Sequence, residues 1–169
     1  MATKLATPGV YVEEKSSFGN TVVSVPTAVP AFVGYTEKAS NATKDLTNAP
    51  TRITSFSEYI DLFGGPSKTK FEITSDEDSS FKLKMVKSTR FMMYDSLRLF
   101  FNNGGSECYI VSTGAYSSGL NSKKISDKKS NGGIVALEKH LEPTILVVPD
   151  ATLFSQNECY AIQAEMLAH

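Results

Sequence analysis

Cysteine and histidine, which build many catalytic and metal sites, are scarce: the 169 residues include two of each. Cys108 and Cys159 stand among aromatic and aliphatic neighbours and lack metal-site spacing, so we interpret both as buried, reduced thiols. His140 and His169 each lack a second ligand at helical spacing, which gives little support to zinc binding or to histidine base chemistry. The sequence therefore predicts no catalytic residue, no metal and no cofactor.

Long apolar runs and an excess of one charge are also missing. No segment approaches the roughly 20 apolar residues of a membrane span, and residues 1–8 lack the apolar run of a signal peptide. The formal net charge is -1, so no global field attracts nucleic acid or an anionic membrane. We expect a protein that is made and folded in the cytoplasm, without a nucleic-acid partner and without direct stable membrane binding.

What the sequence does contain is an alternation of strand and helix patterns, which predicts an α/β domain over residues 22–169. Its sheet should be mainly parallel and covered by helices. The run Ala31–Tyr35 is nearly continuously apolar, as expected of a central strand buried on both faces. Further strands are predicted at Cys108–Val111 and Thr144–Val148, and helices at Ser55–Gly65, Phe91–Asn103, Gly133–Leu141 and Leu153–His169.

Two polar insertions interrupt this domain, near residues 66–89 and 112–131. We interpret the first as a solvated loop over the edge of the core, because its acidic cluster at 76–78 lacks the spacing of a calcium loop. The second contains four lysines but no interleaved aromatic residues, so it also reads as a solvated loop and not as a nucleic-acid surface.

Three loops contain residue types that also occur in catalytic or phosphate-binding motifs. The segment Gly64–Thr69 holds glycines, a lysine and a hydroxyl, but it follows a helix, which predicts a helix stop and not a phosphate loop. Ser106 lacks the second glycine of a nucleophile elbow and is interpreted as a turn residue. Asp150 follows the most hydrophobic strand, where α/β enzymes place catalytic groups; without a partner base, it is expected to cap a helix or close a loop. His140 is expected to cap a helix C-terminus.

Residues 1–21 are predicted to form an extended arm and linker. Val10, Tyr11, Val12 and Glu13 alternate as in a strand, yet no second alternating run follows them directly. Such a terminal strand either docks on its own sheet or pairs with the sheet of a neighbouring molecule.

Three segments follow one another along the chain: Pro8–Glu14 with Thr27–Thr36, Ile53–Tyr59 with Phe63–Gly65, and Leu97–Val111 with Val147–Asp150. In this order they resemble the contractile tail sheath proteins of bacteriophages and of phage-derived extracellular injection particles. The resemblance is greatest to the antifeeding-prophage and virulence-cassette types.

The resemblance implies a structural subunit of a contractile sheath, and not an enzyme. Its inter-subunit arm strand would be formed by Pro8, Gly9, Val10, Tyr11, Val12, Glu13 and Glu14. The expected partners are further copies in a helical homo-oligomer, sheath paralogues, an inner tube protein, and baseplate and terminal cap proteins. The resemblance also implies assembly in the bacterial cytoplasm, as part of a phage tail or of a released extracellular particle.

Complete sheath proteins are longer than this chain, so we expect it to be the N-terminal part of a larger protein. Two other interpretations stay open. One is a sheath-fold adaptor or cap protein of the same particle. The other is an α/β nucleotide-binding enzyme, because an α/β sheet does not by itself define a function.

Overall fold

The computed structural model describes residues 28–75 and 80–169, so the predicted arm strand Pro8–Glu14 lies outside the described residues. A four-stranded sheet forms the centre, in the order β10-β1-β7-β4. β1 pairs in parallel with both β10 and β7, whereas β4 runs antiparallel to β7. The strands are β1 (Pro30–Thr36), β4 (Thr51–Ile53), β7 (Cys108–Ala115) and β10 (Ile145–Val147).

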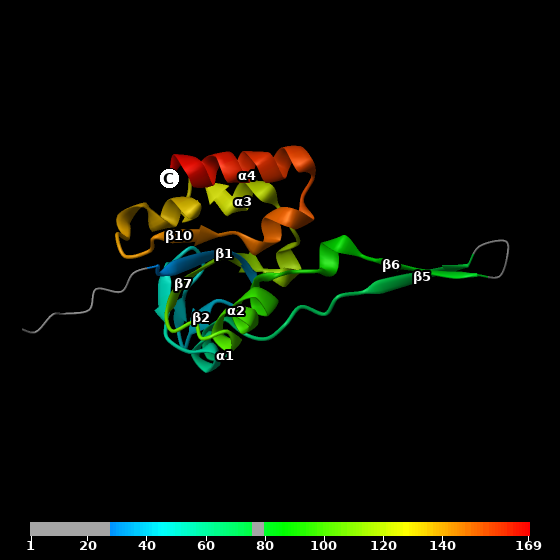
Figure 1. The fold of residues 1–169 in the computed structure, drawn as a ribbon, viewed down its shortest axis with the longest axis horizontal. Coiled ribbons are helices and arrows are strands. Elements are labelled where there is room, and N and C mark those ends of the chain that lie inside the picture. Colours follow the sequence, from blue (N-terminus) through cyan, green and yellow to red (C-terminus); the bar gives the residue numbers. More distant parts are fainter. Residues whose placement is uncertain (1–27, 76–79) are drawn as a thin grey trace, which may run out of the picture.

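Helices cover both faces of this sheet, which confirms the predicted α/β class and the mainly parallel sheet (Figure 1). One face carries the first two helices and the other carries the last two together with a 3-10 helix, η3. Their bounds are α1 (Phe56–Phe63), α2 (Met93–Asn102), α3 (Ser122–Ile125), η3 (Ile134–Lys139) and α4 (Gln156–Ala168).

β1 is the central strand, as its apolar run predicts, and all seven of its residues are buried. Its side chains alternate between the two layers, because successive residues of a strand point to opposite faces. Val33 packs in the layer that contains α3 and α4, whereas Phe32 packs in the layer that contains α1 and α2. Burial on both faces explains why this strand is apolar without interruption.

The first two helices begin and end close to the predicted residues. The Ser55 side chain caps α1 by accepting a hydrogen bond from the Glu58 N–H, and Gly64 ends the helix with a φ of 87°. Glycine adopts this left-handed backbone without the steric cost of a Cβ. α2 ends at Asn102, and Gly104 turns the chain toward β7 with a φ of 90°.

Residues 66–89 do not form the predicted solvated loop. They contain two paired antiparallel strands, β5 (Phe71–Ser75) and β6 (Phe81–Met85), followed by the 3-10 helix η1 (Lys87–Thr89). This β5–β6 ribbon projects away from the body of the protein (Figure 1). The prediction of a loop was wrong because the apolar residues in both segments recur at every second position, which is the signature of a strand.

The second polar insertion is also more ordered than predicted. β7 continues through Ser112 and Thr113, both of which are buried, and α3 lies further along the segment. The Ser112 and Thr36 hydroxyls are 2.6 Å apart, so two polar residues satisfy each other between neighbouring strands. The remaining short elements are β2 (Ser40–Asn41), β3 (Lys44–Asp45), η2 (Tyr116–Ser118), β8 (Ser126–Asp127), β9 (Gly132–Gly133) and η4 (Pro149–Leu153).

Candidate functional site

The carboxyl ends of the parallel strands are the usual ligand position in an open α/β sheet. The connection from β1 to β7 runs through α1 and α2 on one face, whereas the connection from β7 to β10 runs through α3 and η3 on the other. The strand order therefore changes direction at β1, and a ligand would be expected beside its end. Asp150, which follows β10, is the carboxylate that the sequence places there.

Asp150 joins the sheet to a helix. Its carboxylate is fully buried, and its Oδ2 accepts a hydrogen bond from the Tyr35 N–H at 3.0 Å. Its Oδ1 accepts another from the Met92 N–H at 2.7 Å, directly before the first residue of α2. Burial raises the pKa of the carboxyl group, and the two N–H donors act in the opposite direction. The expected loop-closing role is confirmed, with the end of β1 and the start of α2 as the two parts that it connects.

Gly34 makes room for this carboxylate. A Cβ atom at residue 34 would lie 2.7 Å from Asp150 Oδ2 and 3.1 Å from the Met93 methyl group. The sequence signal for this contact was a glycine inside an otherwise apolar strand, which often marks a close approach by another part of the protein. Its partner could not be known before the fold placed Asp150 against it.

Aromatic residues line a hollow of about 380 Å³ beside the same strand ends, together with Glu37 and Lys68. The rings of Tyr116 and Phe91 stack with centroids 4.6 Å apart, and the Tyr116 hydroxyl donates a hydrogen bond to the Gly65 carbonyl at 3.1 Å. The Tyr35 hydroxyl donates to the Asn121 carbonyl and accepts from the Asn121 N–H. Burial raises the pKa of both tyrosines, so their hydroxyls stay protonated and act as structural donors.

The glycines of the segment Gly64–Thr69 stop α1, as predicted. The Gly65 N–H donates a hydrogen bond to the Glu37 carboxylate at 2.6 Å. A phosphate group would need this kind of backbone N–H free, because a phosphate loop surrounds its anion with amide donors. Here a carboxylate of the protein itself holds that position.

The other predicted candidates have structural positions too. Cys108 and Cys159 are both free, as predicted. Cys108 is buried, but the prediction of a buried thiol is wrong for Cys159, which is only half-buried. Burial raises the pKa of the Cys108 thiol to about 12. His140 follows η3, and its N–H donates to the Leu137 carbonyl at 2.8 Å, which is the predicted cap position. Ser106 lies between the Gly104 turn and the start of β7.

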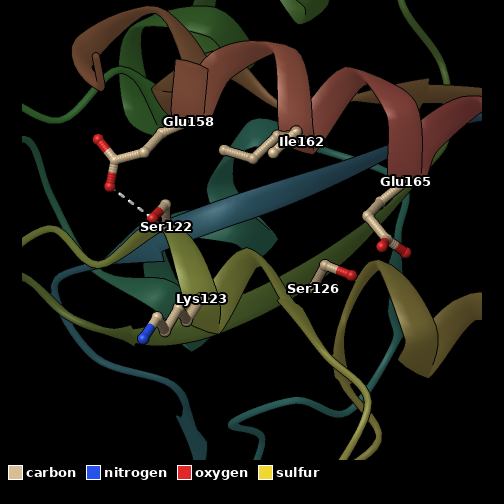
Figure 2. A pocket seen from close by; sticks show the side chains of 7 residues that line it. Ser122, Lys123, Ser126, Glu158, Ile162 and Glu165 are labelled. Carbon is tan, nitrogen blue, oxygen red and sulfur yellow. Dashed lines mark hydrogen bonds between the residues drawn. The ribbon is translucent and has the colours of Figure 1, made fainter. Parts of the chain in front are cut away.

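A hollow of about 200 Å³ lies between α3 and α4 (Figure 2). Its carboxylates already have partners: Glu158 accepts a hydrogen bond from the Ser122 hydroxyl at 2.7 Å, and Glu165 lies 2.9 Å from the Lys128 ammonium group. The buried Ser126 hydroxyl has no partner among the described residues. The volume is below the roughly 300 Å³ at which small-molecule pockets begin. Lys128, one of the four lysines in the second polar insertion, thus forms an ion pair with Glu165 on the protein surface.

The two edges of the main sheet differ in character. At the β4 edge, Arg52 forms an ion pair with Glu107, so charged side chains mark this edge. At the other edge, β10 consists of Ile145–Val147, and Ile145 is 46% exposed. Among the described strands, β1 alone pairs with β10, which leaves the outer side of β10 without a strand. An apolar edge of this kind is a template for strand addition, whereas charges on an edge oppose it.

No protein-family model and no curated protein matches the chain. In the part of the chain that the structure describes, none of the helices is long and apolar enough to cross a membrane. The outer side of β10, with which none of the described strands pairs, is a candidate site for contact with a further strand.

Proposed function

We propose that the chain is a structural subunit of the contractile sheath of a phage tail-like injection particle, polymerising around an inner tube. The observation that carries this proposal is the open apolar edge of β10, beside a core built from the segments that resemble sheath proteins. Thr27–Thr36 includes β1, Leu97–Val111 includes the end of α2 and the start of β7, and Val147–Asp150 begins at the last residue of β10.

The assembly step is the addition of a strand from one subunit to the sheet of the next. In the sheath family the terminal arms perform this step, and Pro8–Glu14 is the segment of this chain that resembles the N-terminal arm. The β10 edge offers backbone groups for main-chain hydrogen bonds, together with apolar side chains for specificity. Because donor and acceptor surfaces differ, the contact is heterologous and produces a helical polymer instead of a closed pair.

Contraction then consists of a collective switch between two packings of the same subunits. The paired strands hold the subunits together while their α/β bodies rotate, and the extended form is metastable. A free-energy difference of about a few kcal/mol per subunit, multiplied along the polymer, would drive the tube through a target membrane.

Two alternatives predict different behaviour. A sheath-fold adaptor or cap protein of the same particle would bind the end of a polymer without extending it. A nucleotide-binding enzyme is less well supported, because the Asp150 and Glu37 carboxylates already accept backbone N–H groups near the strand ends where a nucleotide phosphate would bind.

The test is negative-stain electron microscopy of the chain, alone and with the tube protein of the same particle. We expect tubes or helical sleeves, and we expect that deleting residues 1–18 leaves a folded monomer that no longer polymerises. Tyr11→Pro should reproduce the loss by removing one arm N–H, whereas Lys4→Pro, upstream of the strand, serves as its matched control.

Three results would count against the proposal. Loss of the circular dichroism spectrum on deletion of residues 1–18 would show that the arm strand belongs to its own sheet. Binding to the ends of preformed tubes without growth would favour the adaptor or cap. A persistent monomer whose melting temperature rises with added nucleotide would favour the enzyme.

A further inference from the structure

The β5–β6 ribbon has two chemically different faces. In its register Phe71 pairs with Met85, and Ile73 pairs with Leu83, so the large apolar side chains share one face. Phe81, opposite Ser75, belongs to the same face. The other face contains the pairs Glu72 with Lys84 and Thr74 with Lys82. The ribbon is therefore amphipathic, as a strand pair that covers a hydrophobic surface would be.

This apolar face is exposed in the isolated chain. The exposed fractions are 54% for Phe71, 68% for Ile73, 78% for Phe81 and 67% for Leu83. With about 150–200 Å² for each fully exposed large side chain, the face presents roughly 500 Å² of apolar surface. A two-stranded ribbon is at best marginally stable in water, and contiguous apolar patches of this size mark interaction sites. We therefore expect the apolar face of the ribbon to pack against another protein surface.

A second uncharged surface lies on the outward side of α4, which we define by Gln156, Tyr160, Gln163, Ala164 and Leu167. These residues are spaced so that they share the side of the helix opposite the buried Ile162, and all five are exposed. Tyr160 is 57% exposed and Leu167 is 90% exposed. A solvated helix normally places charged residues on this side, so an uncharged side indicates a missing partner.

The ribbon and the C-terminal end of α4 lie toward opposite ends of the long axis of the molecule (Figure 1). We propose that the apolar face of the ribbon in one copy packs on the outward side of α4 in the next copy. The dimensions agree: five strand residues span about 16 Å, and the 13 residues of α4 span about 20 Å. If each side contributes roughly 500 Å², the contact buries about 1,000 Å², the lower limit of a specific interface.

A contact between two ribbons would also cover the apolar face, but it would leave the outward side of α4 exposed. The head-to-tail contact covers both surfaces and repeats from copy to copy, because its two surfaces differ. It is separate from the arm strand and does not depend on the sheath proposal.

The test is disulfide cross-linking of the full chain in a Cys159→Ser background, where the buried Cys108 is the remaining native thiol. Ile73→Cys is placed on the apolar face of the ribbon and Leu167→Cys on α4. Thr74→Cys, the adjacent residue on the polar face, is the matched control. Mild oxidation of single variants and of mixtures is followed by non-reducing electrophoresis.

We expect one reducible dimer from the mixture of the Ile73→Cys and Leu167→Cys variants, and a ladder when both substitutions share one chain. The control mixture with Thr74→Cys should yield at least tenfold less dimer. Dimers from Ile73→Cys alone, at the expense of the mixed dimer, would overturn the proposal in favour of ribbon-to-ribbon contact.

The absence of any cross-link would also overturn the proposal. Flotation of the chain with phosphatidylcholine and phosphatidylglycerol vesicles, lost in Ile73→Glu but not in Thr74→Glu, would then assign the ribbon to a lipid surface. The cross-linking experiment and the electron microscopy test the two proposals separately. Sheath tubes without a mixed dimer would refute the contact between the ribbon and α4 but not the sheath function. A mixed dimer without tubes would refute the sheath function but not this contact.

Discussion

Replacing Asp150 by asparagine removes one of two buried acceptors without changing the size of the side chain. The amide retains one oxygen, so either the Tyr35 N–H or the Met92 N–H loses its partner. A buried donor left unpaired costs about 1–3 kcal/mol. The neutral amide also avoids the cost of burying a charge, so we expect the lower half of this range at pH 7. Asp150→Ala, which removes both acceptors, should cost more.

Thermal unfolding followed by circular dichroism measures this effect. A loss of 1 kcal/mol corresponds to a decrease of about 2–4 °C in Tm for a chain of this size. Asp61→Asn, at an exposed residue of α1, is the control for the chemical change itself. If Asp150→Asn and Asp61→Asn have the same Tm, the two backbone hydrogen bonds do not stabilise the contact between the end of β1 and the start of α2, and the reasoning is refuted.

The contribution of Asp150 to the free energy of unfolding changes with pH in a definite direction. The pKa of Asp150 is raised above its ordinary value of 3.8, mainly by burial, so its protonated form is favoured in the folded state. Its contribution to stability is therefore fully present below pH 3.8 and declines as the pH rises through the raised pKa. Asp127 behaves oppositely, because hydrogen bonds from Ser130 lower its pKa; its contribution is present above pH 3.8 and declines as the pH falls.

Two further predictions concern the core. Gly34→Ala should lower the free energy of unfolding, measured by urea titration, by about 1–3 kcal/mol, because its Cβ would lie 2.7 Å from Asp150 Oδ2. Gly65→Ala is the control: its Cβ would lie 3.5 Å from the Glu37 carboxylate, so the free energy of unfolding should change little. At pH 8 a chromogenic thiol reagent should modify Cys159 in the folded chain and both cysteines after denaturation, because the pKa of Cys108 is about 12. Equal rates at both thiols in the folded chain would contradict this.

Local patterns were sufficient for most of the core. Ser55 and Gly64 mark the two ends of α1 because capping and left-handed turns depend on residues adjacent to the helix. The continuous apolarity of β1 similarly required burial on both faces. Apolar character was less reliable as a guide to burial: Ile60 in α1 and Leu99 in α2 are 40% and 66% exposed. Spacing defines a face, but only the packed neighbours determine how wide that face is.

The β5–β6 ribbon and strand β4 were not predicted from the sequence, for different reasons. The β5–β6 ribbon was missed although its signal is local: Phe71 and Ile73 alternate with polar residues, and the apolar residues of Phe81–Met85 do the same. β4 was missed because its three residues are too few for any periodicity, and it becomes a strand only by pairing with β7. Short edge strands are decided by the sheet that they join.

The sequence by itself determined the order of the principal elements β1, α1, α2, β7, β10 and α4, the ends of α1 and α2, and the central position of β1, because periodicity, caps and glycines act over a few residues. Only the tertiary structure decided which parts of the chain meet. It brought Asp150 to the end of β1 and to the start of α2, across separations of 115 and 58 residues. It also placed β10 at the edge of the sheet formed by the described strands and turned the ribbon and α4 outward, because exposure depends on packing between distant segments and not on local sequence.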